Sequence, residues 1–198
     1  MNIERAQISE NILKSIVFGL TGKNASGKGT VAEILKRKNF TYHSLSDSLR
    51  DELKSLKKEE TRENLIEIGN KLREEGGPGV LADKLMPKLK SENNHIVDSI
   101  RNPLEVISLR KETLLRRFFL ISVDANARLR YDRLCSRGRI GDTDSWEKFV
   151  EQEKKEENND DPNKQQLSKT MEMADYNIDN SGTLEELEAQ VNIIISSL

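Results

Sequence analysis

The sequence predicts an α/β fold of three layers, with a parallel sheet of about five strands flanked by helices. Five short apolar segments alternate along the chain with helical patterns, as expected for parallel strands joined by crossover helices. The first of these segments leads directly into a glycine-bearing loop and then a helix, an order typical of phosphate-binding sites. In such sheets ligands bind beyond the carboxyl ends of the strands, where the loops gather.

The expected strands are short runs rich in apolar and β-branched residues. They lie at residues 15–21, 40–45, 95–98, 118–123 and 176–179. The fourth run, FFLISV, is continuously apolar, which is typical of a strand buried on both faces of a parallel sheet. The third run ends in a carboxylate, Asp98.

Apolar residues at three- and four-residue spacing predict the helices. Their expected ranges are 31–37, 46–58, 61–76, 80–90, 103–112, 126–136, 146–158, 165–174 and 184–198. Pro103 suits a first helical turn, and the cluster GGPG at 76–79 ends the third helix. Residues 1–14 are expected to form a short polar extension.

We predict a single domain over residues 1–198, built as a core that carries two insertions. The expected core covers residues 15–45, 91–136 and 167–198. Residues 46–90, three helical patterns without a strand, predict a helical substrate-binding insertion over the ligand edge of the sheet. The charged segment 137–166 predicts a short, mobile lid region.

The composition restricts the class of protein. The net charge is −2 with both signs interspersed, so no nucleic-acid partner is expected. The single cysteine, Cys135, excludes an internal disulfide and a cysteine-only zinc site. The apolar runs are too short to span a bilayer, and the first residues lack a signal-peptide core. We therefore expect no membrane partner and a cytoplasmic location.

The segment GKNASGKGT at residues 22–30 is the strongest functional signal. Loop N–H groups and the helix N-terminus would surround an anion, and Lys28 would add a positive charge. The hydroxyl of Thr30 lies one residue later than in the strict G-x-x-x-x-G-K-[ST] pattern. The alternative is an ordinary glycine turn between a strand and a helix. The predicted ATP-binding residues of this loop are Gly22, Lys23, Asn24, Ala25, Ser26, Gly27, Lys28, Gly29 and Thr30.

Thr30 and Asp98 are the candidate ligands for Mg²⁺, partly through water. Asp98 ends a predicted strand, where it would either position the metal or cap the following turn. Metal and Lys28 together would neutralise charge on a phosphoryl group in transfer. The sequence therefore predicts ATP and Mg²⁺ as cofactors.

Several arginines lie near the predicted ligand-side loops, and the guanidinium fork binds phosphate through two bonds. Arg133 and Arg137 lie four residues apart on one helix face that leads into the lid region, with Arg139 beyond them. Arg128 and Arg130 are interpreted instead as part of a solvated face. The predicted catalytic residues are Lys28, Asp98, Arg133 and Arg137. The charged run Glu151–Glu157 is also interpreted as a solvated helix face.

These motifs resemble those of the P-loop kinases of the nucleoside monophosphate kinase group, over nearly the whole chain from Ile16 to Ile195. The loop resembles that of adenylate kinases, which carry Pro and Gly where this chain has Asn24 and Ala25. The segments HSLSDSLR at 43–50 and DSIR at 98–101 resemble the parts of that family that hold the acceptor's phosphate. The resemblance implies three acceptor-binding residues: Asp47, Arg50 and Arg101.

The segment Ala174–Leu187 is most similar to the C-terminal part of dephospho-CoA kinase, whose turn after the last strand lies beside the adenine of ATP. This likeness implies that Asn180 and Gly182 contact ATP. The form D-x-I-R-x-P-x-E-V at Asp98–Val106 and the R-G-R run at Arg137–Arg139 resemble small adenylate-kinase-related proteins. They are also similar to the kinase-like module fused to some deoxycytidylate deaminases, although the zinc signature of the deaminase is absent here.

The resemblance implies an ATP-dependent kinase acting on a small acceptor, with a nucleoside or deoxynucleoside monophosphate as the leading candidate. Dephospho-CoA kinase activity is one alternative. A nucleotide-binding regulatory module without kinase turnover is another. The sequence favours neither a monomer nor a homo-oligomer.

Overall fold

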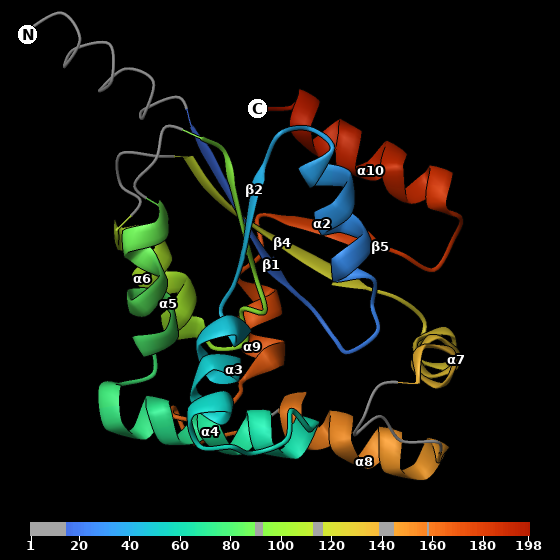
Figure 1. Cartoon of the computed structure of the whole chain (residues 1–198). Coiled ribbons are helices and arrows are strands. Elements are labelled where there is room, and N and C mark those ends of the chain that lie inside the picture. Colours follow the sequence, from blue (N-terminus) through green and yellow to red (C-terminus); the bar gives the residue numbers. More distant parts are fainter. Residues whose placement is uncertain (1–14, 90–92, 113–116, 139–144, 158) are drawn as a thin grey trace, which may run out of the picture.

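Five parallel strands form one sheet in the order β2-β3-β1-β4-β5 (Figure 1). The computed structural model describes residues 15–89, 93–112, 117–138, 145–157 and 159–198. The strands are β1 (Ile16–Thr21), β2 (Thr41–Ser44), β3 (His95–Asp98), β4 (Arg117–Asp124) and β5 (Tyr176–Asp179). The predicted α/β fold with a five-stranded parallel sheet is confirmed. The predicted extension at 1–14 and Arg139 lie outside the described residues.

Helices occupy the expected segments between the strands. They are α2 (Lys28–Lys36), α3 (Ser46–Ser55), α4 (Arg62–Gly76), α5 (Val80–Leu85), α6 (Pro103–Glu112), α7 (Ala127–Arg137), α8 (Trp146–Glu157), α9 (Leu167–Glu172) and α10 (Leu184–Ser196). The prediction of one α-helix over 80–90 is wrong beyond Leu85, because the chain continues as a 3-10 helix, η1 (Met86–Leu89). Pro87 lacks the N–H that an α-helical bond would require.

The helices cover both faces of the sheet and make three layers (Figure 1). Successive side chains of a strand point to opposite faces, and β1 shows the result. Val17 belongs to the cluster formed with α3, α4, α5 and α6, whereas Phe18 belongs to the cluster beneath α2 and α10. Both side chains are fully buried. The sheet is therefore apolar on both faces, as the continuous apolar runs predict.

The carboxyl ends of β1, β2 and β3 meet at one edge of the sheet. Ser44 at the end of β2 lies in register with Asp98 at the end of β3. The end of β1 is tied to the chain after β3, because the Thr21 hydroxyl donates to the Ile100 carbonyl at 2.9 Å. Helices α4 and α8 lie beyond this edge (Figure 1), so the edge carries the candidate site.

None of the helices within the described ranges is both long enough and apolar enough to cross a membrane.

Candidate nucleotide and acceptor site

A cavity of about 890 Å³ lies at the carboxyl edge of the sheet. Its walls come from the loop after β1, the ends of β2 and β3, the first turns of α3 and α4, and the end of α7. Many of the residues predicted from the sequence line it together: Asn24 to Thr30, Arg50, Asp98, Arg101, Arg133 and Arg137. The cavity is large enough for a nucleotide-sized ligand. Gly22, Lys23, Asp47, Asn180 and Gly182 are not among its lining residues.

The phosphate loop takes its shape from three residues with positive φ. A side chain at Gly22, whose φ is +138°, would meet the Val123 carbonyl oxygen at 2.0 Å. One at Gly27, whose φ is +99°, would meet the Asn180 amide nitrogen at 2.0 Å. Ala25 adopts a φ of +56°, a conformation that favours glycine.

Asn180 supports the loop from behind. Its buried side-chain amide donates to the Ser26 carbonyl at 2.8 Å, and its own carbonyl accepts from the Arg133 guanidinium at 2.9 Å. The turn after β5 therefore fixes the loop and one of the arginines of α7. The contact of Asn180 and Gly182 with adenine stays a prediction.

Lys28 lies at the start of α2 with its ammonium group turned onto the loop. The Nζ atom donates to the carbonyl oxygens of Gly22 and Lys23, each at 2.7 Å. Burial, followed by the positive charge of Arg101, lowers the pKa of Lys28 to about 7, although Asp98 opposes the change. The site by itself therefore disfavours the charged ammonium, and a bound polyphosphate would stabilise it.

This pKa predicts that ATP binding takes up a proton. Polyphosphate favours the charged ammonium, so binding raises the pKa of Lys28 from about 7 toward its ordinary value. We expect uptake of close to one proton at pH 8, and an affinity that is greatest below pH 7 and falls by up to about tenfold per pH unit above it. Calorimetry in two buffers of different ionisation enthalpy measures the uptake. Lys28→Arg is the matched control, and uptake that persists in this variant would contradict the assignment.

Asp98 faces the cavity from the end of β3. One of its carboxylate oxygens accepts from the Tyr42 hydroxyl at 3.0 Å, and the other accepts from the Ser99 N–H at 2.5 Å. Burial and the Asp98 charge raise the pKa of Tyr42 above its ordinary value, so Tyr42 remains a donor that orients Asp98. Ser99 adopts a φ of +67°, which turns the chain sharply behind the carboxylate.

Carboxylate and hydroxyl oxygens are ligands that Mg²⁺ accepts, and Asp98 and Thr30 both line the cavity. Within the described ranges, no group of three or more His, Cys, Asp and Glu side chains could hold a metal. An ion at Asp98 and Thr30 would complete its coordination with water and phosphate oxygens, as Mg²⁺ commonly does.

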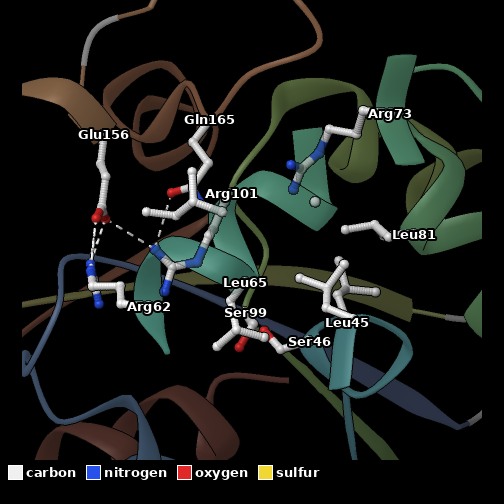
Figure 2. Close-up of a pocket in the computed structure, with 13 residues that line it drawn as sticks. Leu45, Ser46, Arg62, Leu65, Arg73, Leu81, Ser99, Arg101, Glu156 and Gln165 are labelled. Carbon is white, nitrogen blue, oxygen red and sulfur yellow. Dashed lines mark hydrogen bonds and ion pairs between the residues drawn. The ribbon is translucent and has the colours of Figure 1, made fainter. Parts of the chain in front are cut away.

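A second group of charges surrounds the carboxylate of Glu156 on α8 (Figure 2). Arg62 at the start of α4 approaches its two oxygens at 2.6 Å each, and Arg101 approaches one of them at 3.3 Å. Arg101 also donates to the Gln165 side chain at 3.2 Å. Burial lowers the pKa of Arg101 despite the opposing charge of Glu156. Arg101 thus lines the cavity but is paired within the protein, and its contact with an acceptor stays a prediction.

The remaining predicted residues also have partners. Arg50 pairs with Glu60 at 2.6 Å and with Asp47 at 3.1 Å, so two predicted acceptor-binding residues contact each other. On α7, Arg137 donates to the Asn24 side chain at 3.0 Å. The buried Nη1 atom of Arg133 has no hydrogen-bond partner among the described residues, which leaves a donor for a ligand anion.

The interpretation of Arg130 as part of a solvated face is wrong. Its side chain is buried, pairs with Glu153 of α8 and donates to the Ala125 carbonyl at 2.8 Å. Arg128 is exposed, as expected, and lies over the Tyr131 and Trp146 rings.

The interpretation of residues 151–157 as a solvated face is also wrong in part. Glu153 and Glu156 pair with buried or half-buried arginines, and Glu157 pairs with Lys23 of the phosphate loop at 2.6 Å. The spacing from the buried Phe149 to these three residues is that of one helix stripe. The spacing could have indicated that these glutamates share the buried face of the helix. It was overlooked because an analysis of hydrophobic periodicity assigns glutamate to the exposed face.

Arg62, Tyr42 and Glu105 are the other site residues that sequence reasoning missed. Only Glu105 had a visible signal, as the glutamate of the D-x-I-R-x-P-x-E-V form. Its carboxylate accepts from the backbone N–H of Arg101 at 2.8 Å and from the Arg73 guanidinium at 2.8 Å. It therefore fixes the backbone that carries Arg101.

Comparison with known proteins matches the chain to a family and to a fold. Residues 19–159 match the family described as AAA domain, a P-loop domain. A UPF0200 protein of Pyrococcus furiosus is 33% identical over 187 residues, covering 92% of this chain and 97% of the relative. A UPF0200 protein of Hyperthermus butylicus is 30% identical over 185 residues, covering 92% and 95%.

Solved structures show the same fold at low sequence identity. Shikimate kinase from Aquifex aeolicus aligns with a TM-score of 0.54 at 13% identity, covering 91% of this chain and 96% of that one. A gluconokinase from Sinorhizobium meliloti aligns with a TM-score of 0.54 at 16% identity, covering 94% and 99%. The chain therefore shares its fold with small-molecule kinases.

Proposed function

The chain belongs to the UPF0200 family and carries an AAA domain, and from this premise we propose that it is an ATP-dependent kinase. It transfers the γ-phosphoryl group of ATP to a small acceptor that bears a phosphate, with a nucleoside or deoxynucleoside monophosphate as the leading candidate. The observation that carries the proposal is the convergence of Lys28, Asp98 and five arginines on one cavity. Such a set of charges suits phosphoryl transfer, where catalysis is mainly positioning and electrostatic stabilisation.

The phosphate loop and α7 form the ATP side of the proposed site. The N–H groups at the start of α2 and the Lys28 ammonium bind the phosphates. Asp98 and Thr30 would hold Mg²⁺, which supplies charge neutralisation when bound. Arg133 and Arg137 line the same cavity from α7 and stabilise charge on the transferring group.

The insertion and the β3–α6 connection form the acceptor side. Arg50, Arg62 and Arg101 line the cavity together with Tyr42 and Ser44. Three guanidinium groups on one wall favour an acceptor with an anionic group. A neutral acceptor would leave these arginines without a ligand partner.

A panel of acceptors tests the proposal. We expect ADP formation that depends on an acceptor, with the phosphorylated product detected by chromatography or ³¹P NMR. The panel contains ribo- and deoxyribonucleoside monophosphates, dephospho-CoA, shikimate and gluconate. The last two are included because of the structurally similar kinases. Turnover of a nucleoside monophosphate supports the proposal.

Two other outcomes would replace it. Transfer to dephospho-CoA alone would assign the alternative that the segment at 174–187 favours. Tight ATP binding without transfer to any acceptor would identify a regulatory nucleotide-binding module.

A further inference from the structure

The carboxylate of Glu156 is held as an anionic ligand would be held. Arg62 contacts it through Nε at 2.9 Å and through Nη2 at 2.6 Å, and Arg101 contacts its second oxygen (Figure 2). The Glu156 side chain is only 7% exposed. A guanidinium fork offers the same geometry to a carboxylate and to a phosphate. Glu156 therefore occupies an anion site built from two elements other than its own helix.

Both arginines of this anion site also belong to the large cavity. Arg62 and Arg101 line it together with Lys28 and Asp98. A smaller hollow of about 60 Å³ lies beside them, walled by apolar side chains such as Leu49 and by the Glu156 carboxylate. This hollow holds only about two water molecules. Movement of the Glu156 side chain away from the arginines would enlarge it.

We propose that Glu156 is an internal competitor for the acceptor's phosphate, and that a phosphate monoester binds by displacing it from Arg62 and Arg101. This inference rests on the proposed function, because it names the group of the acceptor that the site recognises. The displacement exchanges one carboxylate for one phosphate on the same two guanidinium groups.

Charge decides which ligands can displace the carboxylate. The arginine pair carries two positive charges and Glu156 supplies one negative charge, so a dianionic phosphate balances the pair better than the carboxylate does. A tethered group competes at a local concentration on the order of millimolar, which weak or uncharged ligands do not overcome. Glu156 is thus a specificity-determining residue that favours phosphate monoesters over neutral acceptors.

Helix α8 provides a matched control for this residue. Glu153, one turn earlier, also pairs with a buried arginine, but its partner is Arg130 of α7, which is not among the cavity-lining residues. Replacing either glutamate with glutamine removes ion pairs that anchor α8: those with Arg62 and Arg101 for Glu156, and the one with Arg130 for Glu153. Only Glu156→Gln exposes the anion site.

The test is calorimetric titration with inorganic phosphate, with the phosphate loop first saturated by Mg²⁺ and a non-hydrolysable ATP analogue. We expect Glu156→Gln to bind phosphate at least about tenfold more tightly than the wild type, and Glu153→Gln to show no such gain. The gain should vanish in the double variant Glu156→Gln/Arg101→Gln. Equal affinities in wild type and Glu156→Gln, or an equal gain in Glu153→Gln, would overturn the inference.

Hydrogen exchange on the wild type tests the displacement without any substitution. We expect amides of residues 146–157 to exchange faster at saturating phosphate, because the ion pairs of Glu156 are lost. Unchanged or slower exchange there would contradict displacement.

The two proposals fail in different ways. If the wild type phosphorylates an acceptor but Glu156→Gln does not bind phosphate more tightly, this inference is refuted and the kinase proposal is supported. If the protein does not bind the ATP analogue, but Glu156→Gln still binds phosphate more tightly and the double variant does not, the anion site is supported and the kinase proposal is refuted.

Discussion

Replacing Lys28 with methionine is expected to lower phosphoryl transfer by about 10²- to 10³-fold or more, the scale for removing one preorganised charge from a reacting centre. The ammonium group of Lys28 is held at the mouth of the loop by the Gly22 and Lys23 carbonyls. Lys28 lines the cavity together with the loop residues that would bind the phosphates. Methionine keeps the length and packing of the side chain but cannot donate or carry charge. A coupled assay of ADP release measures the loss.

The fold should survive this change. Lys28 lies half-buried at the wall of the cavity and not in the apolar core, and methionine occupies nearly the same space. The matched control is Lys36→Met at the other end of α2, where the side chain is exposed and pairs with Glu33. We expect both variants to melt near the wild-type temperature and only the Lys28 variant to lose transfer. Undiminished turnover in Lys28→Met would refute the proposed role of the loop.

The parts of the site that are easiest to predict from the sequence are short continuous segments of the chain. The phosphate loop occupies nine consecutive residues, and its glycine spacing and its lysine indicate phosphate binding. Asp98 and Arg101 lie on one short segment that follows a strand. The fold was equally accessible, since five strands separated by helices allow few topologies when crossovers are right-handed.

The ion pairs between arginines and the glutamates of α8 could not be predicted from the sequence in the same way. Arg62 and Glu156 are separated by 94 residues, and no local pattern indicates that the start of α4 meets the end of α8. Arg130 shows the same difficulty, because its burial depends on Glu153 from a different helix. Charged residues are interpreted as surface by default, and each exception here is created by tertiary contact between α8 and the rest of the site.

Glu105 is expected to be the most sensitive position for stability. Its side chain is fully buried, as is that of its partner Arg73. One carboxylate oxygen accepts from Arg73 Nε and Nη2 at 3.1 and 2.8 Å. The other accepts from the backbone N–H groups of Arg101 and Asn102 at 2.8 and 3.1 Å. The carboxylate thus connects α4 to the first turn of α6, where the helix dipole also favours a negative charge.

Glu105→Ala should lower the free energy of unfolding by about 3–5 kcal/mol, the cost of leaving a buried charge without its partner. Urea denaturation measures this value. Lys111→Ala, on the exposed face of the same helix, should change it by less than about 0.5 kcal/mol. A loss below about 1 kcal/mol for Glu105→Ala would show that Arg73 finds solvent or another partner.

The double variant Arg73→Met/Glu105→Leu separates the charge from the backbone contacts. Removing both charges should restore part of the stability lost in either single variant, because no unpaired ion remains. The restoration should be incomplete, since leucine leaves the N–H groups of Arg101 and Asn102 without their acceptor. If transfer activity stays low while stability recovers, Glu105 serves the acceptor site through the backbone of Arg101. Full recovery of both stability and transfer activity would show that Glu105 acts only through its structural ion pair with Arg73.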